Sequence, residues 1–159
     1  MDRVASLYYY ATLQNSQSLE EFAAHPPFKE VDNDQTRRIA GVDPPLGGCT
    51  RSMLDQAREN LRRHFAVVGT AERFDETLIL LKRKLGWNKE IVSYPRNVNT
   101  ARPTTRSLSQ EAIDAVRKRN ELDFELWEYA SQLLDEAIIA EGSGFSDELD
   151  NYKASLPAR

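Results

Sequence analysis

The sequence contains one convincing strand, and the segments around it have the periodicity of helices. The run "FAVVG", residues 65–69, is short, apolar and closed by a glycine, which is typical of a buried strand in a parallel sheet. Such a strand needs neighbours that bond to its backbone on both edges. No other segment predicts such a neighbour. We therefore predict a fold that is mainly α with one short buried strand, from about Phe65 to Val68, whose partner strands lie outside this sequence.

Apolar residues at helical spacing predict helices on both sides of this strand. Before it, the expected helices cover residues 2–14, "SLEEF" with Ser18 as N-cap, a segment from Asp32 or Asn33 to a C-cap at Gly41, and residues 51–64. After it, they cover "TAERFDETLILLKRKLGW" and a long stretch from about Ser109 to Glu141, in which Asn120 interrupts the first apolar stripe. The stretches "VDPPLGGCT" and "YPRNVNTARPTTRSLS" are typical of loops, and the residues after Gly142 are weakly patterned.

The size and charge of the chain limit its function class. Its 159 residues, 40% of them hydrophobic, are enough for about one domain with a buried core. The 21 basic and 25 acidic residues give a net charge of -4, which argues against a nucleic-acid binder. A local basic pocket for one small anion is compatible with this charge.

Cysteine and histidine are scarce. Cys49 is the only cysteine, so it cannot form an intrachain disulfide, and two histidines, His25 and His64, do not make a metal cluster. We therefore expect no bound metal. The sequence has no apolar run of membrane-spanning length and no signal-peptide pattern. We therefore expect a cytoplasmic chain as written, or a membrane-associated one if a longer parent carries an N-terminal anchor.

Four segments carry a family resemblance. They are "DRVASLYYYATLQNSQSLEEFAAHP", "NDQTRRIAG", "NLRRHFAVVGTAERFDETLILLKRKLGW" and "LSQEAIDAVRKRNELDFELWEYA". In this order they resemble the C-terminal part of the sulfotransferase family that includes the heparan sulfate 2-O-sulfotransferases and their bacterial relatives. The resemblance implies the C-terminal portion of a P-loop-like α/β sulfotransferase fold. Residues 1–141 would form the C-terminal part of a sulfotransferase domain, and residues 142–159 a C-terminal tail.

The resemblance also implies a reaction. The family transfers a sulfuryl group from 3'-phosphoadenosine 5'-phosphosulfate (PAPS) to a hydroxyl or amine, here a glycan or other hydroxyl acceptor. A P-loop-like turn holds the 5'-phosphosulfate, and a later motif, Arg-Asp-Pro-x-x-Arg-x-x-Ser, holds the 3'-phosphate through its first Arg and its Ser. Arg3 matches the later Arg of that motif and Ser6 matches the Ser, whereas the first Arg, Asp and Pro would precede Met1.

The chain itself predicts no catalytic residue. Sulfuryl transfer needs an oriented donor and charge stabilisation, and the sequence contains no GxxxxGK-type loop and no obvious base. We therefore expect that the chain lacks the N-terminal donor-binding half and is inactive alone. A non-enzymatic helical remnant or interaction domain is the alternative. The expected partners are the nucleotide donor and a glycan or other hydroxyl acceptor, with no nucleic acid, and the sequence does not specify an oligomeric state.

The candidate donor-binding residues have structural alternatives. Ser6 is expected to contact the 3'-phosphate, or else is a helix-surface hydroxyl. Arg3 shares this role or makes a structural ion pair. A polar loop that the family places over the nucleotide phosphates holds further hydroxyl and guanidinium groups, which suit a phosphate or are simply solvated. These are Arg102, Thr104, Thr105 and Arg106. Glu72 and Arg73 fit helix-start electrostatics, and the tyrosines 8–10 are expected to pack against the sheet.

Overall fold

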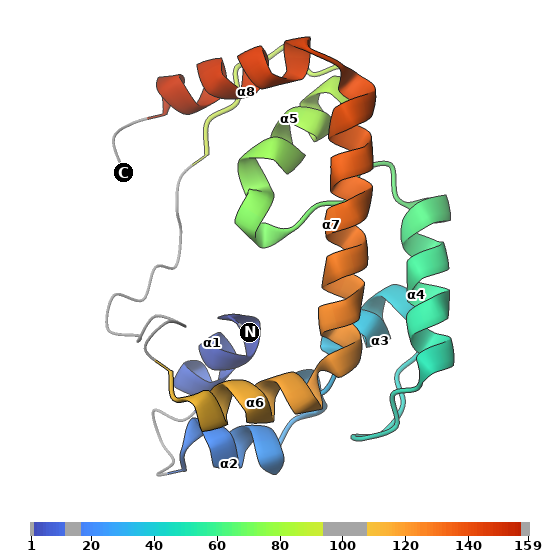
Figure 1. Ribbon diagram of the computed structural model, residues 1–159, viewed down its shortest axis with the longest axis vertical. Coiled ribbons are helices and arrows are strands. Elements are labelled where there is room, and N and C mark those ends of the chain that lie inside the picture. Colours follow the sequence, from blue (N-terminus) through green and yellow to red (C-terminus); the bar gives the residue numbers. More distant parts are fainter. Residues whose placement is uncertain (1, 12–16, 94–107, 157–159) are drawn as a thin grey trace. The chain divides into compact units, whose positions relative to one another are not determined.

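The structure, a computed structural model, describes residues 2–11, 17–93 and 108–156. Within these ranges the chain is helical and contains no β-strand, as Figure 1 shows, so the prediction of a mainly helical chain is confirmed. The helices are α1 (Asp2–Ala11), α2 (Leu19–Ala24), η2 (Lys29–Val31), α3 (Asp34–Ala40), α4 (Arg51–His64), η3 (Ala71–Arg73), α5 (Phe74–Leu85), α6 (Gln110–Arg119), α7 (Glu121–Glu141) and α8 (Gly144–Ser155).

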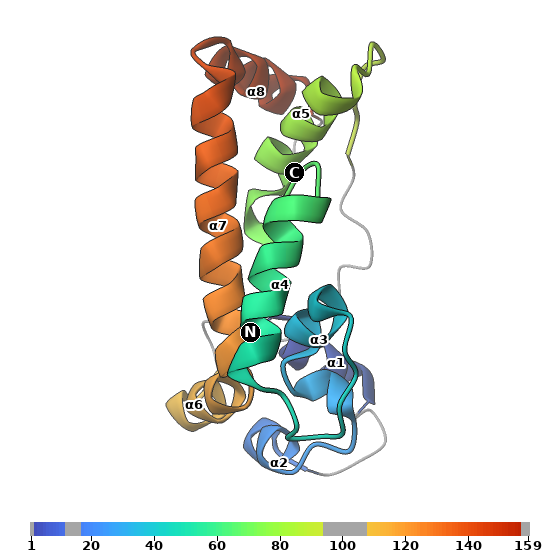
Figure 2. The same ribbon diagram turned by 90° about the vertical axis from the view of Figure 1, so that its right-hand side faces the viewer.

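The chain forms two compact units, and Figure 2 shows their elements from a second direction. Unit 1 consists of Met1–Arg58 and Asn97–Leu126, and unit 2 consists of Glu59–Arg96 and Trp127–Arg159. Each unit is thus assembled from two stretches that are far apart in the sequence. Contacts between such stretches, rather than local helix propensity alone, must hold each unit together.

The core of unit 1 lies between short amphipathic helices. Figure 1 shows α2 and α6 side by side in this unit, and the Phe22 ring packs edge-on against Tyr8 with 5.5 Å between the ring centroids. The buried members of this core are Val4, Leu19, Phe22, Ala23, Val31, Ala112 and Val116. Burying a large apolar side chain contributes roughly 1.5–3 kcal/mol, so this cluster is the main support for α1 and α2.

The core of unit 2 is formed by α5, α7 and α8. Its buried members are Ile79, Leu80, Leu134, Phe145, Leu149 and Tyr152. The helix α8 occupies the stretch that is weakly patterned in sequence, and three of its side chains lie in this core. The Tyr152 hydroxyl also donates a hydrogen bond of 2.7 Å to Ser93 Oγ.

A salt-bridge cluster links α5 to α8 in unit 2. Lys82 Nζ lies 2.6 Å from Glu148 Oε1, and Arg83 Nε lies 2.7 Å from Glu148 Oε2. The hydrogen bonds from Lys82 and then Arg83 hold the pKa of Glu148 below its ordinary value. Because the folded-state pKa is lowered, this stabilisation is present above the unfolded pKa and is lost as the pH falls through the folded pKa.

We therefore expect Glu148→Gln to lower the free energy of unfolding by about 1 kcal/mol at neutral pH, and by much less at about pH 3. Urea unfolding of both proteins at the two pH values measures this difference. Asp150→Asn, at an exposed position of the same helix, is the control and should change neither value. A loss from Glu148→Gln that is equal at both pH values would contradict the ionic role.

The predicted strand at Phe65–Val68 is wrong. Residues 65–70 have no regular secondary structure, and Phe65 is 50% exposed rather than buried. A strand requires a neighbour to pair its backbone, and the described residues provide none. The glycine at the end of the run has a different role, because a Cβ atom at Gly69 would lie 2.0 Å from Thr77 Oγ1. Only glycine permits this close approach to α5 without a rearrangement.

The long helix predicted from Ser109 to Glu141 is two helices, α6 and α7, separated at Asn120. Several helix ends are confirmed. Ser18 forms a capping box with Glu21 at the start of α2, α3 follows Asn33, and Gly41 ends α3 in the left-handed conformation. In the part of the chain that is described, no helix is both long enough and apolar enough to cross a bilayer.

Candidate functional site

The predicted donor-binding residues Arg3 and Ser6 lie on α1 in unit 1. Ser6 is exposed, whereas the neighbouring Val4 and Ala5 are buried. Arg3 lies about one turn earlier, and its guanidinium forms ion pairs with Asp34 at 3.2 Å and with Asp123 at 3.8 Å. Arg3 therefore makes the structural ion pair that was its alternative role.

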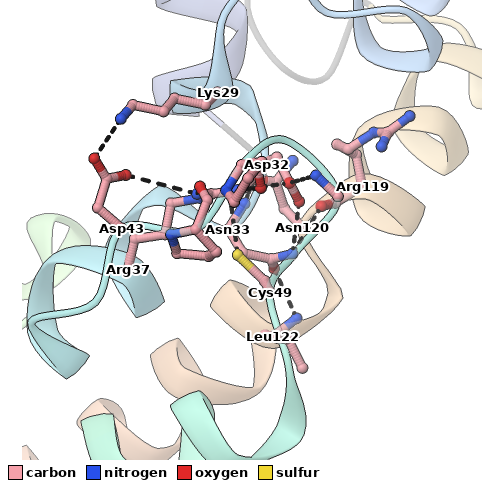
Figure 3. A network of polar contacts seen from close by, with 12 residues as sticks. Lys29, Asp32, Asn33, Arg37, Asp43, Cys49, Arg119, Asn120 and Leu122 are labelled. Atoms are coloured by element: carbon pink, nitrogen blue, oxygen red, sulfur yellow. Dashed lines mark hydrogen bonds and ion pairs between the residues drawn. The ribbon is translucent and has the colours of Figure 1, made fainter.

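A polar network joins the start of α3 to the junction of α6 and α7, and Figure 3 shows the part of it around Asn33 and Arg37. Asp123 belongs to the same network. Asn33 is its centre. The Asn33 Oδ1 atom accepts hydrogen bonds from the amides of Leu122 at 2.9 Å and Asp123 at 3.1 Å, and so caps α7. Its Nδ2 atom donates to the carbonyl of Arg119, at the end of α6, at 3.1 Å. Its own amide donates to Asn120 Oδ1 at 3.1 Å.

The cap is reciprocal. Asp123 in the first turn of α7 accepts hydrogen bonds from the amides of Gln35 at 3.0 Å and Thr36 at 2.7 Å in the first turn of α3. It also accepts a bond of 2.8 Å from the Thr36 hydroxyl. Each helix start is thus capped by a side chain from the other segment. The carboxylates that hold Arg3 are fixed by these same contacts.

A buried ion pair extends the network to the loop after α3. Arg37 and Asp32 have side chains only 3% and 4% exposed, and Arg37 Nη2 lies 2.8 Å from Asp32 Oδ2. The guanidinium also donates to the carbonyls of Pro44 and Pro45, and the amide of Gly47 donates to Asp32 Oδ2 at 2.6 Å. The pair therefore holds the loop against α3. The loop in turn covers both side chains, which is why the Arg37–Asp32 pair is buried.

These buried groups bond to one another, so the network acts as a scaffold and leaves little capacity for a ligand. Burial also raises the pKa of the Cys49 thiol beside this loop, which disfavours the reactive thiolate. Among the described residues, no group of three or more His, Cys, Asp or Glu side chains could hold a metal ion. The scaffold fixes α1 by its Arg3 end and leaves Ser6 facing outward.

The other predicted residues are distributed as follows. The phosphate-loop candidates Arg102, Thr104, Thr105 and Arg106 lie outside the described residues. His25 and His64 are exposed at helix ends. Of the tyrosines, Tyr8 packs in the core of unit 1, but Tyr10 is 82% exposed. The prediction that the tyrosines pack against a sheet is therefore wrong, since the described residues hold no sheet and α1 buries only one side.

Unit 2 contains an open groove of about 380 Å³ that sequence reasoning did not predict. Its walls come from the end of α4, the 65–68 segment, α5 and α7. The apolar lining includes Leu61, Phe65, Val67, Leu80, Leu133 and Ala137, and the charged residues that line it are Arg62, Lys84, Glu136 and Glu141. The "FAVV" run forms one wall of this groove, with Phe65 and Ala66 exposed and Val67 packed against the core of unit 2.

A second feature of unit 2 lies where η3 meets α7. The indole Nε1 of Trp127 donates a hydrogen bond of 3.1 Å to Glu72 Oε2, although the residue is 47% exposed. Arg73, next in sequence, bonds to Glu76 at 2.6 Å and to Asp135 at 2.5 Å. The hydrogen bonds that Arg73 donates to Glu76 raise the pKa of the Arg73 guanidinium. Glu72 and Arg73 thus make tertiary contacts to α7 besides their place at a helix start.

Comparisons with known proteins identify the class. Galactose-3-O-sulfotransferase 2 of Homo sapiens is 29% identical over 151 residues, which cover 86% of this chain and 37% of that protein. The Mus musculus protein of the same name is 27% identical over 130 residues, covering 76% of this chain and 33% of that protein. Heparan-sulfate 6-O-sulfotransferase 2 of Gallus gallus is 28% identical over 127 residues, or 73% of this chain and 30% of that protein. These relatives are all sulfotransferases.

The family is identified more closely by the family model for galactose-3-O-sulfotransferase, which matches residues 43–144, more than half of the chain. The chain therefore belongs to the galactose-3-O-sulfotransferase family. The prediction of a sulfotransferase is confirmed, while the resemblance to heparan sulfate 2-O-sulfotransferases in particular is not confirmed. The chain spans about a third of the length of these relatives. No solved structure matches it.

Proposed function

We propose that this chain is part of a PAPS-dependent sulfotransferase that transfers a sulfuryl group to a hydroxyl of a galactose-containing glycan. The observation that carries this proposal is the family match over residues 43–144. The names of the human and mouse relatives support galactose as the acceptor sugar, where the sequence alone predicts only a glycan or other hydroxyl acceptor.

We further propose that this chain contacts the 3'-phosphate end of the donor. The sequence has no GxxxxGK-type loop for the 5'-phosphosulfate, so transfer needs a cradle that the 159 residues do not supply. When bound, PAPS supplies the sulfuryl group and the leaving phosphate. The purified chain is then expected to bind nucleotide without turning over PAPS. Measurable sulfuryl transfer to a galactoside by the chain alone would contradict the expectation that the chain binds nucleotide without catalysing transfer.

Within this proposal, Ser6 donates a hydrogen bond to the 3'-phosphate. Its hydroxyl is exposed on α1, which is fixed by the ion pairs of Arg3 with Asp34 and Asp123. Arg3 adds positive charge one turn away, but the two carboxylates compete for it. We therefore assign Arg3 mainly to positioning α1. The candidates in the polar loop, residues 102–106, would approach the same phosphate.

Ser6→Ala is expected to weaken the binding of 3',5'-phosphoadenosine by about 10- to 100-fold. A hydrogen bond to a charged group contributes roughly 1.5–3 kcal/mol, which corresponds to this range. Adenosine 5'-monophosphate lacks the 3'-phosphate and should bind both proteins alike. Calorimetric titration of the two nucleotides measures the difference.

Ser143→Ala is the matched control, because Ser143 is an exposed helix-end serine in unit 2 whose side chain makes no capping bond. It should leave both affinities unchanged. Equal losses for the two nucleotides in Ser6→Ala would mean that Ser6 supports the fold instead. No nucleotide binding by the unmodified chain would reject a donor site here and favour the alternative, a non-enzymatic helical remnant or interaction domain.

A further inference from the structure

Trp127 combines exposure with a fixed orientation. Nearly half of its surface, 47%, is exposed on α7, yet its indole N–H is held by Glu72 at 3.1 Å. An exposed indole without such a bond would sample several rotamers, and ordering it would oppose ligand binding. The contact to Glu72 reduces this cost, so the ring is prepared to receive a ligand.

The groups near this indole are charged and hydrogen-bonding. Glu72 is itself exposed and retains acceptor capacity beyond the indole bond. Arg73 lies beside it and bonds to Asp135, whose side chain is 59% exposed and lies two helical turns after Trp127. The indole thus has one carboxylate acceptor beside it, Glu72, and the Arg73–Asp135 ion pair lies about 12 Å further along α7.

An exposed aromatic ring beside a carboxylate suits a sugar ligand better than a protein partner. A hexose ring has C–H groups that pack on an aromatic surface and hydroxyls that bond to carboxylates and guanidinium groups. Galactose in particular collects several C–H groups on one face, because its 4-hydroxyl points to the other. The centre of a protein interface, in contrast, is depleted in Glu and Asp.

We propose that Trp127 stacks against the galactose ring of the acceptor glycan, with Glu72 both orienting the indole and accepting a bond from a sugar hydroxyl. This inference rests on the proposed function, which it extends by assigning an acceptor-binding surface in unit 2. The donor contact proposed at Ser6 lies in unit 1 and is tested separately.

The chain offers a matched control in its second tryptophan. Trp87 follows α5, lies in the same unit and is 43% exposed. In Trp87→Phe, Trp127 is the only tryptophan left, and methyl β-galactoside is expected to shift the tryptophan emission in a saturable way. In Trp127→Phe only Trp87 remains, and the same titration should give no shift. A shift that is found with Trp87 but not with Trp127 would overturn the proposal.

Affinity provides the second measurement, by ligand-detected NMR with the full chain. Trp127→Ala is expected to weaken methyl β-galactoside binding about tenfold, since an aromatic contact contributes up to about that factor. Glu72→Ala should weaken it about fivefold through the lost hydrogen bond. If Trp127→Ala does not fold, the fluorescence of the two Phe variants still decides the matter. Equal binding of methyl β-glucoside, or no binding of either sugar, would overturn the assignment.

Failure of the sugar-binding proposal can be distinguished from failure of the proposed donor-binding function. Retention of Ser6-dependent binding of 3',5'-phosphoadenosine without galactoside binding would reject the sugar surface and leave the donor site intact. Galactoside binding at Trp127 without nucleotide binding would support the sugar surface and reject the donor contact.

Discussion

Replacing Asn33 with alanine is expected to lower the free energy of unfolding by about 3 kcal/mol or more. The change removes the cap on α7, which contributes roughly 0.5–2 kcal/mol, and leaves the carbonyl of Arg119 and the amides at the start of α7 without this partner. It also places alanine at φ 49°, a left-handed conformation that costs about 1–2 kcal/mol for residues other than Gly, Asn and Asp. Urea unfolding followed by circular dichroism measures the loss.

Two further variants separate these contributions. Asn33→Gly keeps the left-handed backbone accessible and removes only the side chain, so it should lose about 1–2 kcal/mol less than Asn33→Ala. Asn88→Ala, at an exposed position after α5, is the control and should change stability by less than about 0.5 kcal/mol. If Asn33→Ala were as stable as Asn88→Ala, the reciprocal capping would have no energetic role.

The second large effect is expected from Arg37→Met, at about 3–5 kcal/mol. Methionine fills much of the same volume but leaves the Asp32 carboxylate buried without its cation, and removing one partner of a buried pair typically costs this much. It also removes the donors to the carbonyls of Pro44 and Pro45. The measurement is the free energy of unfolding in urea.

Arg38→Met is the matched control for this prediction. Arg38 is the next residue on α3 and pairs with Asp34 at 2.8 Å, but its side chain is 66% exposed. Because the Arg38 side chain lies largely in water and Asp34 keeps its ion pair with Arg3 at 3.2 Å, this variant should lose about 1 kcal/mol or less. The double variant Asp32→Asn with Arg37→Met should recover part of the loss, because no uncompensated charge remains buried. Equal effects of the two single Arg variants would show that burial of the Asp32–Arg37 pair is not decisive.

Local patterns were enough to predict most of the helices and several of their ends, but not α8 in the weakly patterned stretch after Gly142. The Ser18 cap and the Gly41 stop follow from rules that act over three or four residues, and both are present. The break at Asn120 also had a local signal. Asn120 is followed by acidic residues in the first turn of α7, Glu121 and Asp123, which is typical of a helix start.

The strand and the polar network could not be predicted in the same way. The apolar run at Phe65–Val68 favours a strand only if another strand pairs with it, and a single sequence does not show whether such a partner is present. The contact of Asn33 with Leu122 joins residues that are 89 positions apart, which no periodic pattern predicts. Of the candidate site, the ion pair of Arg3 was foreseen as an alternative, while its partners Asp34 and Asp123 were not.

The reciprocal caps also have a consequence for how the chain folds. The hydrogen bonds that the Thr36 amide donates to Asp123 and the Leu122 amide donates to Asn33 each close a loop of nearly 90 residues. Neither helix start is therefore completed until the two ends of that loop have met. Contacts of such long sequence separation slow folding relative to a helical bundle with local contacts. We therefore expect the starts of α3 and α7 to gain protection from amide exchange together and late in refolding, after local turns such as the Ser18 capping box.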